Sequence, residues 1–427
     1  MKKPLKLSIN EFISGQEFDG MKQINLHNGF LDPTMMREKL LLDFFNRKGL
    51  PAPRCTFAEV YFDSSYVGLF KVVEEVDKRF LNTHFGNKDG NLYKGEPRGT
   101  LEWHGSAQWN YYKFYELKTN EDKNNWDDIM NFIDLVNHSA RADFKREMDY
   151  IFNTDSYLMM WAANNLFGNL DAYFYQPHNY YLYHNTSTGK FEWITWDVGT
   201  AFGVFPFWKV ENSVTLDPVF YTESANKRPL NEHLLEIDDY RDIYFRAYCD
   251  YLHNDFTKEK LFPAIDSIAN RIRPFIYAEP DSNQMYPETD FEGNIGYVDI
   301  KKWWYSLPAL KSFIENRHNY LVNRLCELDR SCVAGIDVAP VINEITNVFP
   351  NPADDEITVT VKYIEKETPS VDFILIDISG RVAGQYTIYP QGLSAQVIID
   401  LKNLPGGIYL LVTEAGCRKI SKKVVVF

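Results

Sequence analysis

Apolar residues recur at spacings of three and four in two long stretches of the chain. NNWDDIMNFIDLVNHSARADFKREMDYIF begins at residue 124, and LPALKSFIENRHNYLVNRLCEL covers residues 307–328. The repeating positions are Trp126, Ile129, Ile133 and Val136 in the first stretch, and Leu310, Phe313, His318, Leu321 and Leu325 in the second. This spacing gives a helix one apolar face. Both stretches are therefore predicted to be amphipathic helices.

A different pattern, alternation of apolar and polar residues, marks the first third of the chain. TFAEVYFDSSYVGLFKVVEEVD alternates on both sides of Asp63-Ser64-Ser65, which predicts a β-hairpin turning there. Gly68 lies early in the second strand, where it indicates either a β-bulge or the close approach of another backbone or a ligand. GNLYKGE predicts a further short strand that carries Lys94.

The pattern changes again near residue 330. SCVAGIDVAPVINEITNVFPNP is poor in charge and contains three prolines, as expected of a linker. Short alternating runs follow, from EITVTVKYI to ISKKVVVF, with turn signals between them. Five to seven strands at this spacing predict a small antiparallel β-sandwich. We therefore expect an α+β domain over 1–330, a linker over 331–342 and an all-β immunoglobulin-like sandwich over 343–427.

Composition and charge exclude several classes of protein. The 427 residues are 45% hydrophobic, which supplies a large core, and the net charge of −14 argues against binding to nucleic acid or to an anionic membrane. No apolar run reaches 18 residues, so no transmembrane segment is predicted. The opening MKKPLKLSINEF lacks the apolar run of a signal peptide.

Cysteine and histidine spacing gives little sign of a metal site. The five cysteines form no CxxC pair and the nine histidines form no HExxH, so zinc is not expected. A disulfide between Cys326 and Cys332 stays open, because it depends on an oxidising compartment. His178 and His184 are interpreted as strand or loop residues.

Three polar residues stand out in GNLDAYFYQPHNYYLYHNTSTGKFEWITWDVG, residues 168–199. Asp171, Asn179 and Asp197 follow the order of base, first metal ligand and second metal ligand in ordinary protein kinases. Phosphoryl transfer needs a carboxylate facing the attacking hydroxyl, and oxygen ligands that hold Mg²⁺ between the phosphates. Each residue singly could instead cap a turn or a strand end.

Four stretches in order resemble the CotH kinase family. They are FDGMKQINLHNGFLDPTMMREKL, YVGLFKVVEEVDKRFL (aligning Gly68 and Glu74), GNLYKGE, and the Asp…Asn-Tyr-Tyr…Trp-Asp block from Asp171 to Asp197. The resemblance covers about residues 5 to 328 and implies a two-lobed atypical protein-kinase fold. It also implies a secreted enzyme that transfers the γ-phosphate of ATP, with Mg²⁺ or Mn²⁺, to serine or threonine hydroxyls.

The resemblance also implies roles for individual residues. Asp171 would be catalytic, Asn179 and Asp197 would bind metal, and Lys94 with Glu74 would bind the nucleotide. Glu116 is a second candidate partner for Lys94, and Lys94 could instead be a solvated lysine at a strand edge.

The sequence departs from the family pattern in two places. Gly199 stands where the family usually has a second acid, which puts one metal ligand in doubt. No glycine-rich loop of the G-x-G-x-x-G type precedes Lys94, since Gly86, Gly90 and Gly95 form only a loose glycine-bearing segment.

The tail from about residue 345 is similar to the C-terminal sorting domain of type IX secretion. NVFPNPADDEITV, IDISGRV, IDLKNLPGGIYLL and KISKKVVVF carry this resemblance. It implies export to the cell surface or beyond by the type IX machinery of Bacteroidetes-like bacteria. The competing hypothesis is a catalytically inactive surface protein for adhesion or glycan binding. Trp303-Trp304 would be its candidate patch, unless these residues pack internally.

Overall fold

The computed structural model describes residues 2–205, 212–221, 227–301, 305–328, 342–363, 371–388, 394–415 and 418–427. It contains two compact units, Met1–His318 and Asn319–Phe427. The predicted linker over 331–342 lies outside the described residues except for Ile342, where a strand begins. Trp303, Trp304, Cys332 and the side chain of Cys326 also lie outside them.

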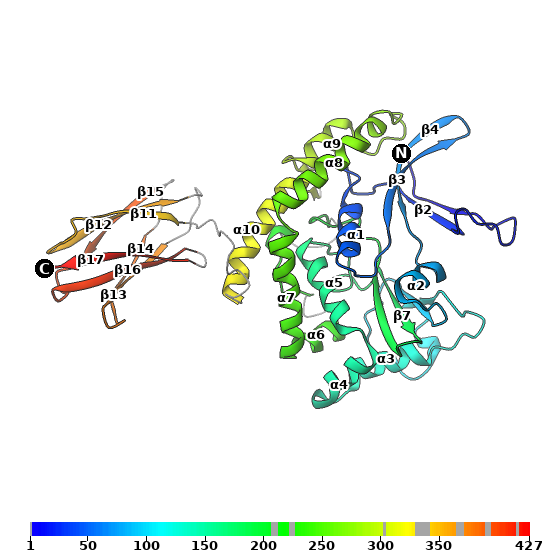
Figure 1. Ribbon diagram of the computed structural model, residues 1–427, viewed down its shortest axis with the longest axis horizontal. Helices are drawn as coiled ribbons and strands as arrows, with labels where there is room; N and C mark the ends of the chain where they lie inside the picture. Colours follow the sequence, from blue (N-terminus) through cyan, green and yellow to red (C-terminus); the bar gives the residue numbers. More distant parts are fainter. Residues whose placement is uncertain are drawn as a thin grey trace. The chain divides into compact units, whose positions relative to one another are not determined.

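The first unit mixes two antiparallel sheets with helices (Figure 1). One sheet has the order β1-β2-β4-β3 and the other the order β6-β5-β7-β8. Their strands are β1 (Leu5–Ser8), β2 (Gln23–His27), β3 (Cys55–Phe62), β4 (Ser65–Val73), β5 (Leu92–Gly95), β6 (Tyr115–Leu117), β7 (Tyr180–Asn185) and β8 (Lys190–Thr195). A two-stranded pair is formed by β9 (Ile300–Lys301) and β10 (Ser306–Leu307).

The hairpin predicted around Asp63 is confirmed, because β3 and β4 pair on either side of it. At Gly68 the sheet shows the register shift expected of a β-bulge, and the group that approaches closely is the Glu279 side chain rather than another backbone or a ligand. A register shift follows its partner Val60, and a Cβ built on Gly68 would lie 2.8 Å from the Glu279 carboxylate. That carboxylate accepts a hydrogen bond from the N–H of Leu69 at 2.8 Å, so the missing side chain permits this contact.

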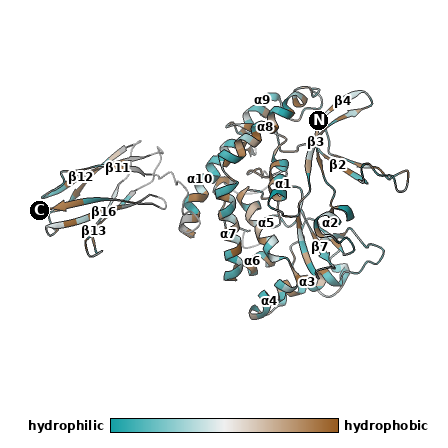
Figure 2. Ribbon diagram, viewed as in Figure 1, coloured by the Kyte–Doolittle hydropathy of each residue, from teal (hydrophilic) through white to brown (hydrophobic). Residues whose placement is uncertain are grey.

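Helices pack against the sheets and one another. They are α1 (Arg37–Arg47), α2 (Lys78–Phe85), α3 (Asp127–His138), α4 (Arg141–Ile151), α5 (Thr154–Leu166), α6 (Pro229–Leu235), α7 (Asp238–Asn254), α8 (Lys258–Tyr277), α9 (Glu288–Ile295) and α10 (Leu310–Leu328). Helix α5 is buried along most of its length and packs on α7 and β8. Most helices carry both hydrophilic and hydrophobic residues, the amphipathic pattern expected from the sequence (Figure 2).

The two predicted helices have different outcomes. The stretch at 307–328 forms α10, as expected. The stretch from residue 124 forms two helices, because Ser139 and Ala140 adopt extended ψ angles of 137° between α3 and α4. Neither residue is glycine or proline, so the apolar spacing predicts one continuous helix where the structure has two.

After the end of α10, the second unit is all β in its described residues and has its own core. Its strands are β11 (Ile342–Phe349), β12 (Glu356–Tyr363), β13 (Val371–Asp377), β14 (Val382–Ile388), β15 (Ser394–Asp400), β16 (Gly407–Ala415) and β17 (Arg418–Val426). They form two sheets of order β11-β12-β15 and β14-β13-β16-β17. Alternate residues Ile357, Val359 and Val361 of one sheet share a buried cluster with Phe373 and Leu375 of the other. The alternation predicted for the tail therefore produces its buried core. The chain as a whole has a mixed α and β region followed by an all-β C-terminal region.

Two further observations bear on the earlier expectations. Cys249 is disulfide-bonded, which the cysteine spacing did not predict, and Cys55 is a buried free thiol. Among the described residues, no helix combines the length and the apolar character needed to cross a bilayer.

Candidate active site

A buried lysine near the end of β4 organises the candidate site. Nζ of Lys71 lies 3.0 Å from Oε2 of Glu38 and 3.7 Å from Oδ2 of Asp32. These three side chains are at most 2% exposed. A buried charge is tolerated only when it is matched, and the two carboxylates match this one. Because Glu38 lies in the first turn of α1, the ion pair ties that helix to the sheet.

The sequence DPTMMRE builds the helix end that presents Glu38. Oδ2 of Asp32 accepts the backbone N–H of Arg37 at 3.0 Å, and the Thr34 hydroxyl accepts the N–H of Met36 at 3.3 Å. These bonds satisfy donors that a helix N-terminus leaves free. The Arg37 guanidinium donates to Asp32 and to Oδ1 of Asn294, both at 2.8 Å, which anchors the helix end to α9.

The charges in this cluster shift one another's pKa values. Burial alone would raise the pKa of Glu38, but Lys71 and His27 outweigh it and lower that pKa to about 2. Burial would lower the pKa of Lys71, but Glu38 and Asp32 raise it above its usual value. The pKa of His27 is raised in the same way, since Glu38 and Asp197 outweigh its burial. The cluster therefore favours an ionised Glu38 and charged Lys71 and His27.

Asp197 follows β8 and comes close to this cluster. Ligand atoms of His27, Glu38 and Asp197 all lie within 4.8 Å of one another. The Asp197 carboxyl keeps contact with solvent, yet dense surrounding protein and the Glu38 charge raise its pKa. Its backbone is left-handed, with φ 47°. Such backbone strain is often retained at functional sites.

Asp171 and Asn179 form a second part of the site. Nδ2 of Asn179 donates to the backbone carbonyl of Asp171 at 2.9 Å and to its Oδ2 at 3.1 Å. Oδ1 of Asp171 lies 2.7 Å from Nε2 of His178. Asn179 is also left-handed, with φ 59°. The carboxylate is therefore held on both oxygens while 21% of the side chain stays exposed.

The two parts are connected through the segment that carries Asp197. The N–H of Trp196 donates to the Asn179 carbonyl at 3.1 Å, and the charge of Asp171 contributes to the raised pKa of Asp197. The Trp196 ring makes edge contacts with His27 at 6.0 Å and with Tyr181 at 5.7 Å between centroids. The end of β2 and the strand β7 therefore meet at this aromatic residue.

The structure does not form the expected Lys94–Glu74 pair. Lys94 lies 3.1 Å from Glu96, and Glu74 is bound by Arg54 at 2.6 and 3.0 Å. Glu116, the alternative partner, pairs with Lys118 at 2.9 Å, although it lies opposite Lys94 in the strand register. The family resemblance points to a lysine on the second sheet, whereas Lys71, which pairs with the buried Glu38, lies on the first.

Sequence reasoning missed Lys71, Glu38 and His27. Lys71 lies in the apolar run LFKVV, where a charged residue has to be buried and matched, and this was the available signal. Glu38 lies in the stretch FDGMKQINLHNGFLDPTMMREKL, which carries part of the family resemblance, but no role is assigned to it there. His27 ends a strand and gave no separate signal.

Contacts with neighbouring atoms show what a side chain would meet at Gly199, Gly90 and Gly95. A Cβ built on Gly199 would lie 3.6 Å from Oδ1 of Asp197, an ordinary contact, so there is room for an acid beside Asp197 that this chain lacks. A Cβ on Gly90 would collide with the His184 carbonyl at 1.7 Å, and one on Gly95 with Tyr180 at 2.4 Å. Gly90 and Gly95 therefore permit close packing on β7.

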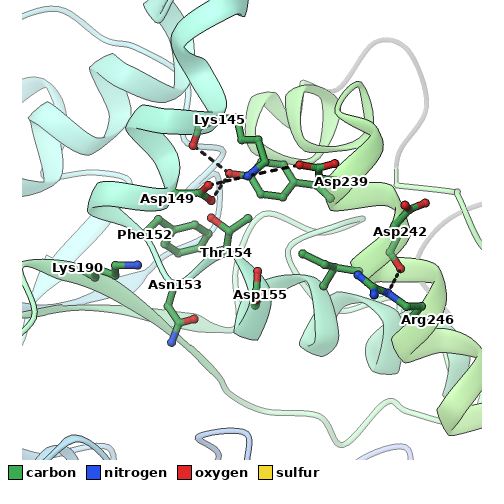
Figure 3. A pocket seen from close by; sticks show the side chains of 12 residues that line it. Lys145, Asp149, Phe152, Asn153, Thr154, Asp155, Lys190, Asp239, Asp242 and Arg246 are labelled. Carbon is green, nitrogen blue, oxygen red and sulfur yellow. Dashed lines mark hydrogen bonds and ion pairs between the residues drawn. The ribbon is translucent and has the colours of Figure 1, made fainter.

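A separate polar pocket of about 500 Å³ lies among α4, the start of α5 and α7 (Figure 3). Its lining includes none of the predicted site residues. Lys145 lies between Asp149 at 2.8 Å and Asp239 at 3.6 Å, and Asp149 accepts the Tyr240 hydroxyl at 2.6 Å. These charged groups neutralise one another, so we place no chemistry there.

Comparison with known proteins agrees with the two-part organisation. Residues 1–321 match the family described as CotH kinase protein, and residues 347–427 match the secretion system C-terminal sorting domain. The chain is 27% identical over 319 residues to the inner spore coat protein H of Bacillus subtilis (strain 168). That alignment covers 74% of this chain and 81% of the relative. The first match includes Lys71, Glu38 and all three residues of the Asp…Asn…Asp series.

Proposed function

Because the chain belongs to the CotH kinase protein family, we propose that it is a secreted or surface-exposed atypical protein kinase with a two-lobed kinase-like fold. It would transfer the γ-phosphate of ATP to serine or threonine hydroxyls of extracellular proteins. The observation that carries this proposal is the buried Lys71–Glu38 pair beside Asp197, with the Asp171–Asn179 pair connected to it through Trp196. Phosphoryl transfer needs this kind of charge placement more than it needs covalent chemistry from the protein.

Lys71 and Glu38 take the role that the sequence assigned to Lys94 and Glu74. A lysine held by a buried acid from a helix can pair with phosphate oxygens without reorganising. Lys71 meets this condition, because Asp32 and Glu38 fix its ammonium group. Lys94 is 31% exposed and has only Glu96 as a described ion-pair partner.

Asp171 would accept the proton of the attacking hydroxyl. A general base must be partly accessible and held in one orientation. His178 and Asn179 each hold one of its oxygens, and the side chain is partly exposed. Asp171 is therefore the best placed carboxylate for this role.

A divalent cation, Mg²⁺ or Mn²⁺, would be held by Asp197 and by Oδ1 of Asn179, the amide atom not used in donating to Asp171. Their chemistry fits, since carboxylate and amide oxygens are ligands for hard cations. When bound, such a cation neutralises charge that develops on the transferred phosphoryl group. The protein's part is to fix these oxygens through the strained backbone of both residues.

The tail supports secretion or a surface location, since it matches a secretion system C-terminal sorting domain. We propose the type IX machinery as its partner. This location fits an enzyme whose acceptors are surface or extracellular proteins. It fits the competing adhesion hypothesis equally well, so the test must address catalysis.

The test is transfer of labelled phosphate from ATP with Mg²⁺ or Mn²⁺ to a generic acceptor protein. Asp171→Asn should lower turnover by roughly 10²–10⁴-fold and leave ATP binding in place, the usual result of losing a general base. Asp134→Asn is the matched control, because Asp134 also lies 2.7 Å from a histidine, His138, but on an exposed helix face. Equal turnover of wild type and Asp171→Asn would refute the assignment. Stabilisation by oligosaccharides but not by ATP and metal would favour the surface-binding hypothesis.

A further inference from the structure

His27 lies between two carboxylates that come from different elements. It ends β2, Glu38 lies in the first turn of α1, and Asp197 follows β8, yet one ring nitrogen of His27 and one oxygen of each carboxylate lie within 4.8 Å of one another. Two carboxylates at this separation repel each other. In the metal-free protein the positive charge favoured on His27 offsets this repulsion, and a divalent cation bound to the ring would take over that role. Lys71 contacts Glu38 and Asp32, so it compensates one side of the cluster. The side occupied by Asp197 and His27 has the composition of a cation site.

The hydrogen bonding of His27 is typical of a metal ligand. Nδ1 lies 2.9 and 3.0 Å from the two Glu38 oxygens, which fixes the ring and leaves Nε2 available. Histidines that bind metals commonly donate their other ring N–H to a carboxylate in this way. The strand register places His27 opposite Lys71, so both side chains are on the same face of the sheet.

We propose that His27, through Nε2, is a direct ligand together with Asp197 for the divalent cation of this site, and that the site therefore selects Mn²⁺ over Mg²⁺. Glu38 acts as the positioning residue that orients the imidazole. Mg²⁺ takes oxygen ligands almost exclusively, whereas first-row transition ions accept imidazole nitrogen. The inference rests on the proposed function for the catalytic use of the ion, but not for its binding.

The alternative is that His27 serves only as a charged partner of Glu38 and Asp197. In that role it would stabilise the fold and never contact a metal. The two roles differ in one observable quantity, the presence of an imidazole nitrogen in the first coordination sphere of the ion. The experiment is built on that difference.

The full chain is titrated with Mn²⁺ and separately with Mg²⁺ in the absence of nucleotide. We expect Mn²⁺ to bind at least ~10-fold tighter than Mg²⁺, since imidazole favours the transition ion. Pulsed electron paramagnetic resonance of the Mn²⁺ complex should show coupling to a ¹⁴N nucleus. His27→Gln should remove this coupling and weaken Mn²⁺ binding by at least ~10-fold, with Mg²⁺ binding changed by less than about threefold. The matched control is His138→Gln, whose histidine also pairs with a carboxylate at 2.7 Å but lies on an exposed helix, and it should change nothing.

The wild-type spectrum keeps the proposal falsifiable even if His27→Gln does not fold. Absence of ¹⁴N coupling in wild type, or equal affinity for the two ions, would overturn it. Persistence of the coupling in a folded His27→Gln variant would also overturn it. If the coupling is present but ATP neither binds nor is turned over, the metal site stands and the kinase proposal fails. If ATP is turned over and the coupling is absent, only the ligand role of His27 fails.

Discussion

Lys71 on β4 and Lys94 on β5 each pair with a glutamate at about the same distance, 3.0 and 3.1 Å. Their surroundings differ. Lys71 and Glu38 are 2% and 1% exposed, and a helix and a second carboxylate, Asp32, complete the cluster. Lys94 and Glu96 are 31% and 34% exposed and lie two residues apart on the same chain segment.

The difference shows that a motif match and a functional environment are separate properties of a lysine. GNLYKGE resembles a family motif, but the pair it contains is local and partly solvated, and such pairs contribute little. Lys71 brings together two elements and holds a charge where water cannot compensate for it. Removing each lysine in turn tests whether this contrast in surroundings becomes a contrast in stability and in nucleotide binding.

The largest effect is expected from Lys71→Met. Its removal leaves buried Glu38 with His27 and buried Asp32 with Arg37 as their remaining charged partners, and breaking a buried pair in this way costs roughly 3–5 kcal/mol. Urea unfolding of the variant and the wild type measures this difference in the free energy of unfolding. Nucleotide binding should be lost in the fraction that remains folded. A cost below about 1 kcal/mol would mean that the cluster is not electrostatically coupled as described.

The next largest effect concerns acid stability. The pKa of Glu38 is lowered to about 2, so its folded state binds a proton less readily than the unfolded chain does. Its stabilisation is therefore fully present above the unfolded pKa of about 4.5 and is lost as pH falls toward about 2, a total on the order of 3 kcal/mol. Glu38→Gln should remove this part of the pH dependence of unfolding.

Glu116→Gln is the matched control for that measurement. Glu116 also pairs with a lysine, at 2.9 Å, but its side chain is 51% exposed. The control should keep the acid dependence of the wild type. Parallel curves for wild type and Glu38→Gln between pH 2 and 5 would contradict the assignment.

A smaller effect is expected from Glu74→Gln. The Glu74 carboxylate accepts two bonds from the Arg54 guanidinium and one from its backbone N–H, but Arg54 is 65% exposed. Loss of this pair should cost up to about 1 kcal/mol and leave nucleotide binding unchanged. Arg54→Gln should cost a similar amount, and the double variant should not show the sum, as a double-mutant cycle would reveal. Loss of ATP binding in Glu74→Gln would restore its role as the nucleotide-site acid.

Local patterns in the sequence predicted much of the fold. Ile357, Val359 and Val361 alternate in the sequence and are all buried, because a strand with period two puts them on one face. The hairpin at Asp63 and helix α10 follow in the same way from local spacing. The break at Ser139 and Ala140 was not predicted, because neither residue is a glycine or a proline and the apolar spacing continues up to it.

The candidate site, too, was predicted only where its residues lie close together in the sequence. Asp171 and Asn179 are close in the sequence and were expected together, and they share a hydrogen bond. Lys71 lies on β4 and Glu38 on α1, and the strand β3 lies between these two elements in the sequence. Only the tertiary fold therefore brings the two side chains together. One signal was local, the charged residue in the apolar run LFKVV, since a lysine there must find a partner.

The smallest effect is expected from Lys94→Met, the counterpart of Lys71→Met. The ammonium group of Lys94 is partly solvated, and its partner Glu96 can be hydrated once the lysine is gone. The free energy of unfolding should therefore change by less than about 1 kcal/mol, the range of exposed ion pairs. Lys94 still lies opposite Tyr181 in the strand register, and Tyr181 contacts Trp196 at the edge of the site. A weakening of ATP affinity by no more than a few-fold is consistent with that position, and isothermal titration with ATP and Mn²⁺ measures it. If Lys94→Met instead abolishes nucleotide binding while Lys71→Met preserves it, the motif has identified the nucleotide lysine correctly and the buried pair is structural.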